Sequence, residues 1–496
     1  MARSDENPPV AALNSTGALP RGSLVAMIVA CALLMENLDG TVIATALPQI
    51  AASLHEDPVR LSLAITMYLL SLAIFIPASG WFADRFGART VFRLAIAVFT
   101  LGSILCGLSH SLAELTAARI FQGAGGAMMV PVGRLVMLRS AARSELVRAM
   151  AYLTVPAMIG PVLGPPVGGA IVTYASWRWI FFLNLPIGIL GLILVTLFIE
   201  NHKEPETPRL DVAGFLLSGT ALAGLMLGFE TVGRQGVPLP AALALLGLGL
   251  SAALLYLRHA ARCPTPVLDL LLFRVPTFAI AVGGGFLFRI GIGALPLLLP
   301  LMLQLGFGMT AFASGLLTFS SSLGALVMKF TAQPVIRRLG FRRALTGNAI
   351  ISGLFLLGYA ALRPSTPVPV IFALLLTGGF FRSLQFTGIN TLAFADVPPS
   401  RMSRATSLSS TAQQLSLSTG VAVGAVLLHL TLAWRGTAAL TAADFWPAFV
   451  VVALVSGAAA WPLSRLPADA GDEICGRAAM LPGGDREPIR QARRTT

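Results

Sequence analysis

The sequence predicts an all-α integral membrane protein with fourteen transmembrane helices. Long apolar stretches run almost from end to end of the chain, and the loops between them alternate between arginine-rich and arginine-poor. Of the 496 residues, 55% are hydrophobic and only 11% are charged, and the mean hydropathy is +0.79. One soluble core could not hide so much apolar side chain, so most of the surface is expected to face lipid.

Each predicted span is long enough to cross a bilayer. A hydrocarbon core about 30 Å thick requires roughly 20 apolar residues per helix, because every backbone group must be satisfied within the segment. In chain order the spans are expected near 23–47, 61–82, 91–109, 112–134, 147–173, 177–199, 211–232, 238–257, 276–304, 311–333, 344–362, 367–392, 404–430 and 446–464. Residues 1–22 lack the basic-then-apolar order of a cleavable signal, so the first span should remain as a transmembrane helix.

The loop charges predict the topology. The even-numbered connections carry most of the cations: Arg85, Arg89, Arg93, Arg139, Arg143, Arg148, Lys203, Arg209, Arg258, Arg262, Arg274, Arg337, Arg338, Arg342, Arg343, Arg401 and Arg404. The odd-numbered connections carry only Arg60, Arg178, Arg234, Arg363 and Arg435. By the positive-inside rule the even loops are cytoplasmic, and both termini are therefore expected in the cytoplasm.

Several other classes of protein are disfavoured by the composition. The net charge of +13 is spread over many short loops, so it indicates topology and not a nucleic-acid partner. The cysteines at 31, 106, 263 and 475 are scattered and suggest neither a disulfide nor a metal site. A phosphate-binding loop is missing, so ATP is not the expected energy source. The five histidines are dispersed and no enzyme motif is found, so we expect no cofactor and no catalytic residues.

An internal repeat divides the chain. The turn at 80–89 (GWFADRFGAR) follows the second span, and a related turn at 333–342 (QPVIRRLGFR) follows the tenth. Duplicated bundles are typical of transporters. We therefore expect a cytoplasmic segment 1–22, a six-helix bundle 23–200, a linker 201–273 with two inserted helices, a second six-helix bundle 274–466, and a disordered cytoplasmic tail 467–496.

Five motifs resemble those of the major facilitator superfamily, in its fourteen-helix drug:proton antiporter branch. They are the turn at 80–89, the run LDGTVIATALP at 38–48, RIFQGAGG at 119–126, GPVLGPPVGG at 160–169 and WRWIFFLNLPIG at 177–188. The resemblance implies the major facilitator fold and an antiporter that exports amphipathic drugs or toxic compounds in exchange for protons. It also implies a multi-pass protein of the bacterial inner membrane, a role in antibiotic resistance, and alternating access as a monomer.

The turn at 80–89 is a candidate cytoplasmic gate. Gly80 and Gly87 permit close helix approach, and Asp84 can accept hydrogen bonds or pair with Arg85 and Arg89. The alternative is a simple positive-inside loop. The resemblance implies a latch that stabilises the outward-facing state. In the second copy, Arg337 stands where Asp84 stands in the first, so any latch should lie mainly in the N-terminal half.

The run at 160–169 removes side chains from one face of the fifth span. Its Gly160, Gly164, Pro165, Gly168 and Gly169 allow a kink and close backbone packing, which ordinary helix contacts would also use. The resemblance implies an antiporter motif that seals the bundle interface against proton leak.

Ionisable residues at membrane depth are the strongest functional candidates, since a charge there costs at least about 2.5–3.5 kcal/mol. Glu36 and Asp39 lie three residues apart on one face of the first span. Two carboxylates this close cannot easily both be ionised in a low dielectric, which suits a proton carrier. The alternative is structural pairing with Arg119 of the fourth span. The resemblance implies that Arg119 couples proton binding to transport, and both interpretations can hold.

Cations replace acids in the C-terminal half. Arg289, Lys329 and Arg382 fall within the ninth, tenth and twelfth spans, and Lys329 is close enough to the membrane surface to snorkel. The two arginines either reach Glu36 or Asp39 across a cavity or bind an anionic group of a substrate. The candidate substrate cavity consists of Arg289, Arg382, Lys329, Gln385, Phe386 and Asn390. Gln304 and Tyr68 are further polar and aromatic candidates near it.

Three functions stay open. Export of amphipathic compounds by proton antiport is favoured, and proton-coupled transport of one anionic or lipid-like metabolite is the alternative. A membrane-embedded enzyme is the alternative from another class, and it predicts turnover without any proton gradient. The expected partners are the lipid bilayer, protons and a small amphipathic substrate.

Overall fold

The computed structural model describes residues 21–140, 146–201, 209–231, 238–398, 401–437 and 439–471, and it describes their side chains except at 21–23 and 138–158. Within these ranges the regular elements are all helices, and no strand is present. The predicted terminal segments 1–22 and 467–496 lie largely outside the described residues, and so do Arg143, Lys203 and Cys475.

The helices follow the predicted spans in order. In the first half they are α1 (Arg21–Leu54), α2 (Ser62–Phe75), η1 (Ile76–Ala78), α3 (Ser79–Phe86), α4 (Ala88–Leu108), α5 (Leu112–Ser140), α6 (Leu146–Tyr174), α7 (Trp179–Phe182) and α8 (Asn184–Phe198). The inserted pair is α9 (Val212–Thr231) and α10 (Leu239–Ala260). The second half contains η2 (Leu270–Arg274), α11 (Pro276–Leu301), η3 (Met302–Gly306), α12 (Ala311–Leu339), α13 (Phe341–Ala360), α14 (Val368–Leu392), α15 (Met402–Arg435), η5 (Ala442–Asp444), α16 (Phe445–Gly457) and α17 (Ala460–Ser464).

The helices account for every predicted span. Among the described residues, 12 helical segments are long and apolar enough to cross a membrane. The two other predicted spans contain α6 and α13, which are helices of 29 and 20 residues. Arg342 and Arg343 in the first turn of α13 lower the mean hydropathy of this helix, which explains why it is not among the 12 segments.

The first span is longer than predicted. The sequence suggested an end before Pro48, but α1 continues through this proline to Leu54 and ends at His55, whose φ is +55°. A proline removes only one backbone donor from a helix. Beyond it, Ile50 and Leu54 are buried in an apolar cluster, so tertiary packing sustains the last two turns.

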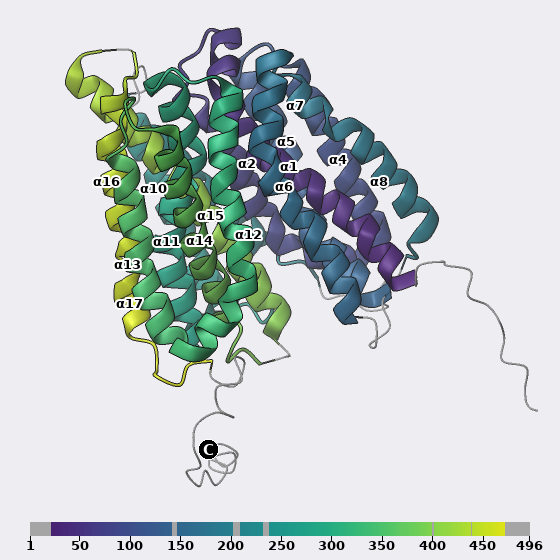
Figure 1. The fold of residues 1–496 in the computed structure, drawn as a ribbon. Coiled ribbons are helices and arrows are strands. Elements are labelled where there is room, and N and C mark those ends of the chain that lie inside the picture. The colour runs from purple at the N-terminus through teal and green to yellow at the C-terminus, as the bar shows by residue number, and fades with distance from the viewer. Residues whose placement is uncertain are drawn as a thin grey trace, which may run out of the picture.

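The two halves lie side by side (Figure 1), and their helices pack in the same pattern, which fits the duplication inferred from the turns. Within the first half α1 packs on α6 and α2 on α5, and within the second α11 packs on α15 and α12 on α14. Between the halves α6 packs on α12, and α15 packs on α2. These contacts place the same pair of helices from each half at the central interface.

Small residues bring the helices close together. Gly224 of α9 lies against Gly249 of α10, and Gly379 of α14 lies against the backbone carbonyl of Ser321 in α12. Lipid tails are as apolar as leucine, so association of helices in a bilayer depends on such close packing more than on the hydrophobic effect. Of the inserted pair, α9 packs on α2 and α15, and α10 packs on α9.

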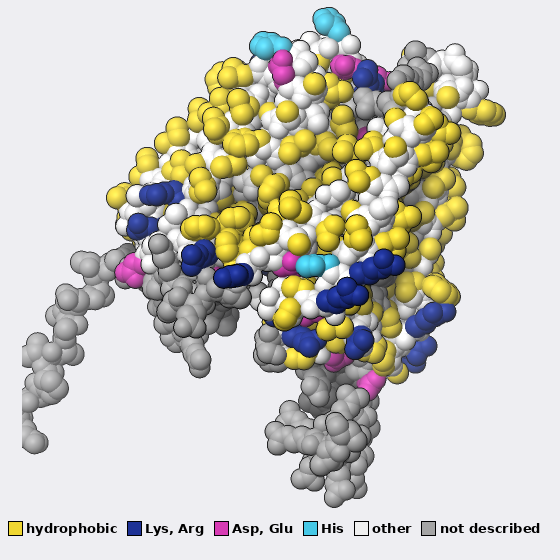
Figure 2. Space-filling view, turned by 180° about the vertical axis from the view of Figure 1, so that it is seen from behind, with side chains coloured by type: hydrophobic (Ala, Val, Ile, Leu, Met, Phe, Trp, Pro, Cys, Tyr) yellow, Lys and Arg dark blue, Asp and Glu magenta, His cyan; other side chains and the backbone are white. Residues whose placement is uncertain are grey.

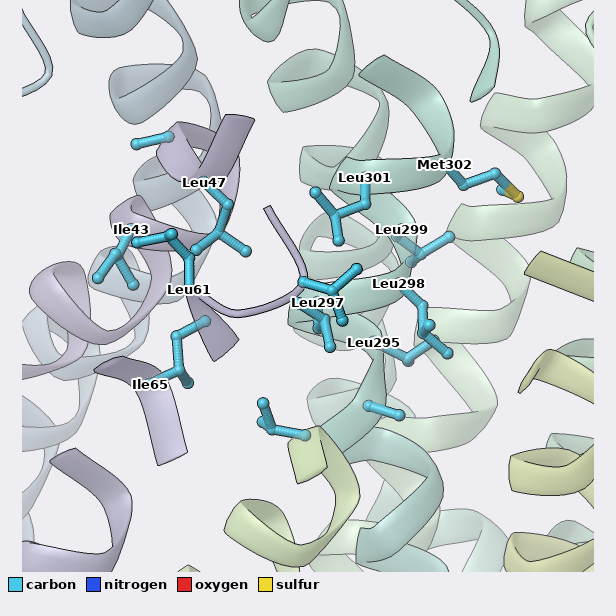
Figure 3. Close-up of a cluster of buried hydrophobic side chains, with 14 of the residues drawn as sticks. Ile43, Leu47, Leu61, Ile65, Leu295, Leu297, Leu298, Leu299, Leu301 and Met302 are labelled. Atoms are coloured by element: carbon cyan, nitrogen blue, oxygen red, sulfur yellow. The ribbon is translucent and has the colours of Figure 1, made fainter. Parts of the chain in front are cut away.

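The halves share one large apolar cluster toward one end of the molecule, and a small cluster around Met67 and Ala422 also joins them. Figure 3 shows Leu47 and Leu61 of the first half on one side and Leu297 and Leu301 of the second half facing them, within one buried cluster. Each of the two other large clusters lies within one half. The members of one fall between residues 25 and 199, and the members of the other fall between residues 256 and 470. Among the described side chains, the halves are therefore joined by an apolar core near the 54–62 and 301–311 connections.

The surface agrees with a membrane environment. Figure 2 shows hydrophobic side chains over the middle of the molecule, and Lys and Arg side chains gathered mostly at its lower end. Large exposed apolar residues include Leu190, Leu197, Leu216, Leu250 and Leu254 on α8, α9 and α10. The chain is a multi-pass membrane protein.

Candidate functional site

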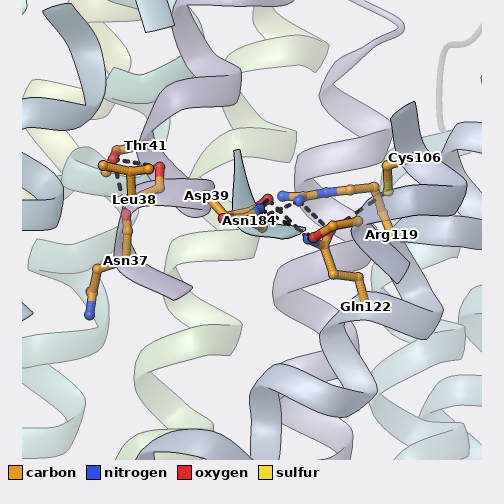
Figure 4. A network of polar contacts seen from close by, with 9 residues as sticks. Asn37, Leu38, Asp39, Thr41, Cys106, Arg119, Gln122 and Asn184 are labelled. Atoms are coloured by element: carbon orange, nitrogen blue, oxygen red, sulfur yellow. Dashed lines mark hydrogen bonds and ion pairs between the residues drawn. The ribbon is translucent and has the colours of Figure 1, made fainter. Parts of the chain in front are cut away.

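A buried ion pair forms the centre of the first half. Asp39 lies midway along α1 and Arg119 lies on α5, and their side chains approach with Nη1 of Arg119 at 2.5 Å from Oδ2 of Asp39 (Figure 4). Asp39 is 3% exposed and Arg119 is 0% exposed. A charge at this depth requires a partner, and each residue supplies it to the other. The predicted structural pairing of these two residues is present.

Two amide side chains complete the environment of Asp39. Its Oδ1 accepts hydrogen bonds from Nε2 of Gln122 and from Nδ2 of Asn184, each at 2.9 Å (Figure 4). Both amides also contact Oγ of Ser103, at 2.7 Å and 3.2 Å. The carboxylate of Asp39 thus has one cation and two neutral donors, an arrangement that stabilises its charged form.

Arg119 is held from three sides but keeps unused donors. Its Nη1 also donates to Oε1 of Gln122 at 2.7 Å, and its guanidinium lies 4.1 Å from the ring centre of Tyr68. Its Nε and Nη2 have no hydrogen-bond partner among the described residues. The aromatic candidate Tyr68 therefore packs under the arginine and belongs to the ion-pair site.

Glu36 is placed differently from Asp39. It lies one turn earlier on α1 and is partly exposed, and its Oε2 is buried without a hydrogen-bond partner among the described residues. The exposed Arg134 of α5 acts on it electrostatically. Glu36 is thus a carboxylate with a nearby cation but without the enclosing amides of Asp39.

The predicted antiporter motif lies at the central interface. On α6, Gly164 and Gly168 face Thr41 and Thr45 of α1, so closely that an added methyl group would overlap their hydroxyls. Gly160 packs against Asn37 of α1 in the same way. These three glycines let α6 lie directly on the helix that carries the carboxylates.

The end of the same motif contacts the other half. Gly169 lies against the carbonyl of Ala311 in α12, and Gly315 of α12 lies against the carbonyl of Pro165. Oγ of Ser322 donates to the carbonyl oxygen of Pro161 at 2.9 Å. The motif therefore packs on α1 with one face and on α12 with another.

Polar contacts also join the halves near their shared apolar cluster. Nε2 of Gln304 donates to the carbonyl of Thr45 at 3.0 Å, and Nε2 of Gln49 donates to Oε1 of Gln304 at 3.2 Å. The backbone amide of Phe312 donates to Oγ1 of Thr173 at 3.1 Å. Gln304, which the sequence suggested as a cavity residue, instead bridges the two halves in this structure.

The candidate gate is a tight turn tied to α8. Gly87 has φ +93°, a conformation that favours glycine, and the matching Gly340 has φ +75°. Nη1 of Arg89 donates to the carbonyl of Ile199 at 3.2 Å, and Asn201 packs directly on Gly87. An added methyl group at Gly80 would meet nothing within 4 Å, so the predicted close helix approach at Gly80 is wrong for this structure. Arg85 is exposed. Glycine at both turns fits the inferred repeat.

Replacing Asp84 with Asn is expected to shift the protein toward states that are open at the 80–89 turn. A latch acts through a free-energy difference between conformations, and the amide loses the charge that such a latch uses. Spin labels at the exposed Phe86 and Leu339, at the ends of α3 and α12, should report longer distances. Unchanged distances and unchanged transport would leave the turn with only its topological role.

The C-terminal candidates form two small clusters. Arg289 of α11 is 1% exposed, and its Nη2 donates to Oδ1 of Asn390 at 2.7 Å. Its guanidinium also lies 5.4 Å from the ring centre of Phe386. The sequence had placed these three residues near one cavity, and the structure brings them into contact.

The second cluster surrounds Arg382. Its Nη2 donates to Oγ of Ser321 at 3.0 Å, and it lines a small interior cavity together with Tyr359. Gln385 accepts a hydrogen bond from Nδ2 of Asn348 at 2.9 Å. Lys329 is exposed on α12. These residues therefore do not form a single site.

The structure does not support pairing of the C-terminal arginines with the acids. Among the described residues, neither Arg289 nor Arg382 contacts Glu36 or Asp39. The oxygens of Asp39 are occupied by partners from its own half, and both arginines bond to residues of theirs. That alternative is wrong for this conformation.

Sequence reasoning missed two members of the central network. Gln122 and Asn184 lie in the quoted motifs, but neither was singled out as a site residue. Both are fully buried amides in apolar spans, and such a placement is itself a signal because a buried amide requires partners.

Comparison with known proteins agrees with this architecture. A model of the Major Facilitator Superfamily matches residues 29–421 and 281–471. Relatives named "Putative multidrug resistance protein MdtD" from Pectobacterium carotovorum and Pectobacterium atrosepticum are each 42% identical over 407 residues, which is 81% of this chain and 86% of theirs. A relative of the same name from Salmonella heidelberg is 42% identical over 412 residues.

A solved structure supports the fold alone. The chain is similar to a POT family transporter crystallised with 5-aminolevulinic acid, with a TM-score of 0.66 and 15% identity. The match covers 90% of this chain and 96% of that one. From the family match and these relatives, the chain belongs to the Major Facilitator Superfamily and is a transporter related to its multidrug resistance proteins.

Proposed function

We propose that this protein is a proton-coupled antiporter that exports amphipathic compounds across the bacterial inner membrane by alternating access. The observation that carries the proposal is the buried Asp39, which has a cation on one oxygen and two neutral amides on the other. A carboxylate enclosed in this way can exist in two protonation states with different partners. It can therefore link proton binding to a change of conformation.

The coupling step follows from the contacts of Asp39. When its carboxylate is charged, Arg119 is held against α1. A proton on Asp39 removes the attraction and leaves Arg119 without a counter-charge, so the arrangement around α1 and α5 must relax. Glu36, one turn nearer the N-terminus of α1, is the second acceptor on the proton's route.

Alternating access is supported by how the halves meet. They share an apolar cluster and the Gln49–Gln304 contact at one end, while the large clusters toward the other end are separate. With the termini in the cytoplasm, the joined end is periplasmic and this conformation faces inward. Glu36 then lies on the cytoplasmic side of Asp39.

The test is accumulation of fluorescent amphiphiles in cells with and without the protein. Cationic, neutral and anionic probes are compared in a strain that lacks other efflux pumps. We expect lower accumulation of at least one class in expressing cells, and loss of this difference after a protonophore is added. Export that persists at full rate after the protonophore collapses the gradient would contradict the proton drive.

Transport of one anionic metabolite is the second candidate, because Arg289 is almost fully buried and no acidic partner is found among the described residues. Its Nε also has no hydrogen-bond partner in the described part of the chain. A cation placed in this way suits an anionic group on a substrate.

Replacing Arg289 or Arg382 with Gln should distinguish the two cargo classes. If these arginines bind an anionic cargo, affinity for it should fall by about 1.5–3 kcal/mol, the scale of a hydrogen bond to a charged group. Lipophilic cations should be transported no worse, since a repulsive charge has gone. Binding of one anionic and one cationic cargo is measured in both variants. If each variant binds both cargoes with the same affinity as wild type does, the arginines have only a structural role.

A further inference from the structure

Three side chains with different donor atoms converge at one end of the inserted helix pair. Asp211 directly precedes α9, His259 lies in the last turn of α10, and Cys263 follows four residues later. A carboxylate oxygen, an imidazole nitrogen and the sulfur all lie within 4.8 Å of one another. The proposed transport mechanism uses none of these residues.

The backbone fixes this convergence from two directions. The amide of Cys263 donates to the carbonyl of His259 at 2.9 Å, so the last turn of α10 places the thiol one turn beyond the imidazole. Asp211 caps the start of α9, where its Oδ1 accepts from the amide of Gly214 at 2.8 Å. The same oxygen lies 2.7 Å from Nε2 of His259. The two inserted helices thus meet at this carboxylate.

The donor set has the chemistry of a zinc site. Zn²⁺ binds thiolate sulfur at about 2.3 Å and imidazole or carboxylate atoms at about 2.0–2.2 Å, in a tetrahedral arrangement. These lengths place ligand atoms about 3.3–3.8 Å apart in a tetrahedron. Here Oδ1 of Asp211 lies 2.7 Å from Nε2 of His259, and all three donor atoms lie within 4.8 Å of one another, so side-chain rotations can bring them to these distances. A water molecule can take the fourth position, since the side chain of His259 is 30% exposed.

Charge also favours a divalent cation. The carboxylate of Asp211 and a thiolate at Cys263 together neutralise two positive charges. The neighbouring Arg258 and Arg262 are exposed, so their side chains can extend into solvent and repel the bound cation only weakly. A hydrogen bond between Asp211 and His259 alone would tie the helices together, but it would not require a thiol within reach of both.

We propose that Asp211, His259 and Cys263 form a binding site for a borderline divalent cation such as Zn²⁺, which fastens the start of α9 to the end of α10. The site lies at one end of the inserted helix pair, α9 and α10, so the metal is bound by the scaffold and is not the cargo. No metal site was expected at Cys263 from the sequence, because 48 residues separate Asp211 from His259.

The first test is Co²⁺ binding by the purified full chain in detergent, without a polyhistidine tag. A thiolate ligand should give a charge-transfer band in the near ultraviolet, and Zn²⁺ should displace it. Cys263→Ser should remove the band and weaken binding at least about tenfold, since even outer-shell partners of metal ligands contribute 10–100-fold. Cys31→Ser, on α1, is the control and should keep both. A spectrum and affinity that are the same in wild type and Cys263→Ser would overturn the proposal.

The second test requires no variant. Alkylation of Cys263 by a maleimide is followed by mass spectrometry with and without Zn²⁺, and Cys31 of the same molecule is the internal reference. Bound metal should slow the reaction of Cys263 at least about tenfold, because the thiolate is then a ligand, and leave Cys31 unchanged. Equal rates at Cys263 with and without Zn²⁺ would mean that the cluster is only a hydrogen-bonded tie between helices.

Discussion

Replacing Asp39 with Asn is expected to abolish proton-driven transport while exchange of substrate down its own gradient continues. The amide has nearly the same shape, but it cannot carry a proton on and off. It resembles the protonated side chain, so conformations reached by protonated Asp39 should remain accessible. Uphill transport in proteoliposomes with an imposed pH gradient, and counterflow without one, are measured in parallel.

This substitution also leaves Arg119 buried without its counter-charge. Breaking a buried pair by removing one partner typically costs 3–5 kcal/mol, so lower thermal stability is expected as well. The double variant Asp39→Asn with Arg119→Gln removes both charges and should recover part of that stability without recovering uphill transport. Stability and coupling are thereby separated.

Glu114→Gln is the matched control, since it neutralises an exposed carboxylate at the start of α5. It should behave as wild type in both assays. Normal uphill transport by Asp39→Asn would remove Asp39 from the proton path and leave its ion pair as a structural feature.

Replacing Gly315 with Ala is expected to disrupt the interface between the halves. The added methyl group would overlap the carbonyl oxygen of Pro165, and a backbone atom cannot rotate away as a side chain can. Overpacking of this kind typically costs 1–3 kcal/mol. Because α12 and α6 belong to different halves, the loss should appear in transport as well as in thermal stability. Gly169→Ala, which meets the carbonyl of Ala311, should have the same effect.

Gly347→Ala is the control for helix propensity. Gly347 lies in α13, where an added methyl group would meet nothing within 4 Å. Alanine is the better helix former, so this variant should be as stable as wild type or more so. If Gly315→Ala is equally harmless in both assays, the close approach of α6 and α12 does not matter for transport.

The ion pair could be predicted from the sequence because charge within a membrane is costly. Asp39 falls within the first predicted span and Arg119 falls in the first half of the fourth. Each charge needs a partner at that depth. The neutral amides Gln122 and Asn184 carry a weaker signal. Which of them reaches Asp39 depends on how α5 and α8 are rotated about their axes, and the span pattern does not determine that rotation.

Other features depend on contacts between distant segments. Gln304 bridges the halves only because η3 and α1 meet at the joined end, and a cavity lining is an equally reasonable prediction from its position. The length of α1 beyond Pro48 depends on the apolar cluster that buries Leu54. The approach of Asp211 to His259 and Cys263 depends on how α9 packs against α10, and the span pattern does not determine that packing.

Proton flux caused by substrate is the most direct test of whether this protein couples proton movement to substrate movement. Proteoliposomes containing the protein are loaded with a pH-sensitive dye and held at equal pH inside and outside, with the membrane potential clamped. A transported amphiphile is then added to one side. The account predicts that its downhill movement drives protons in the opposite direction in wild type, and that no proton movement accompanies it in Asp39→Asn. Substrate flux in wild type without any change of internal pH would contradict the account.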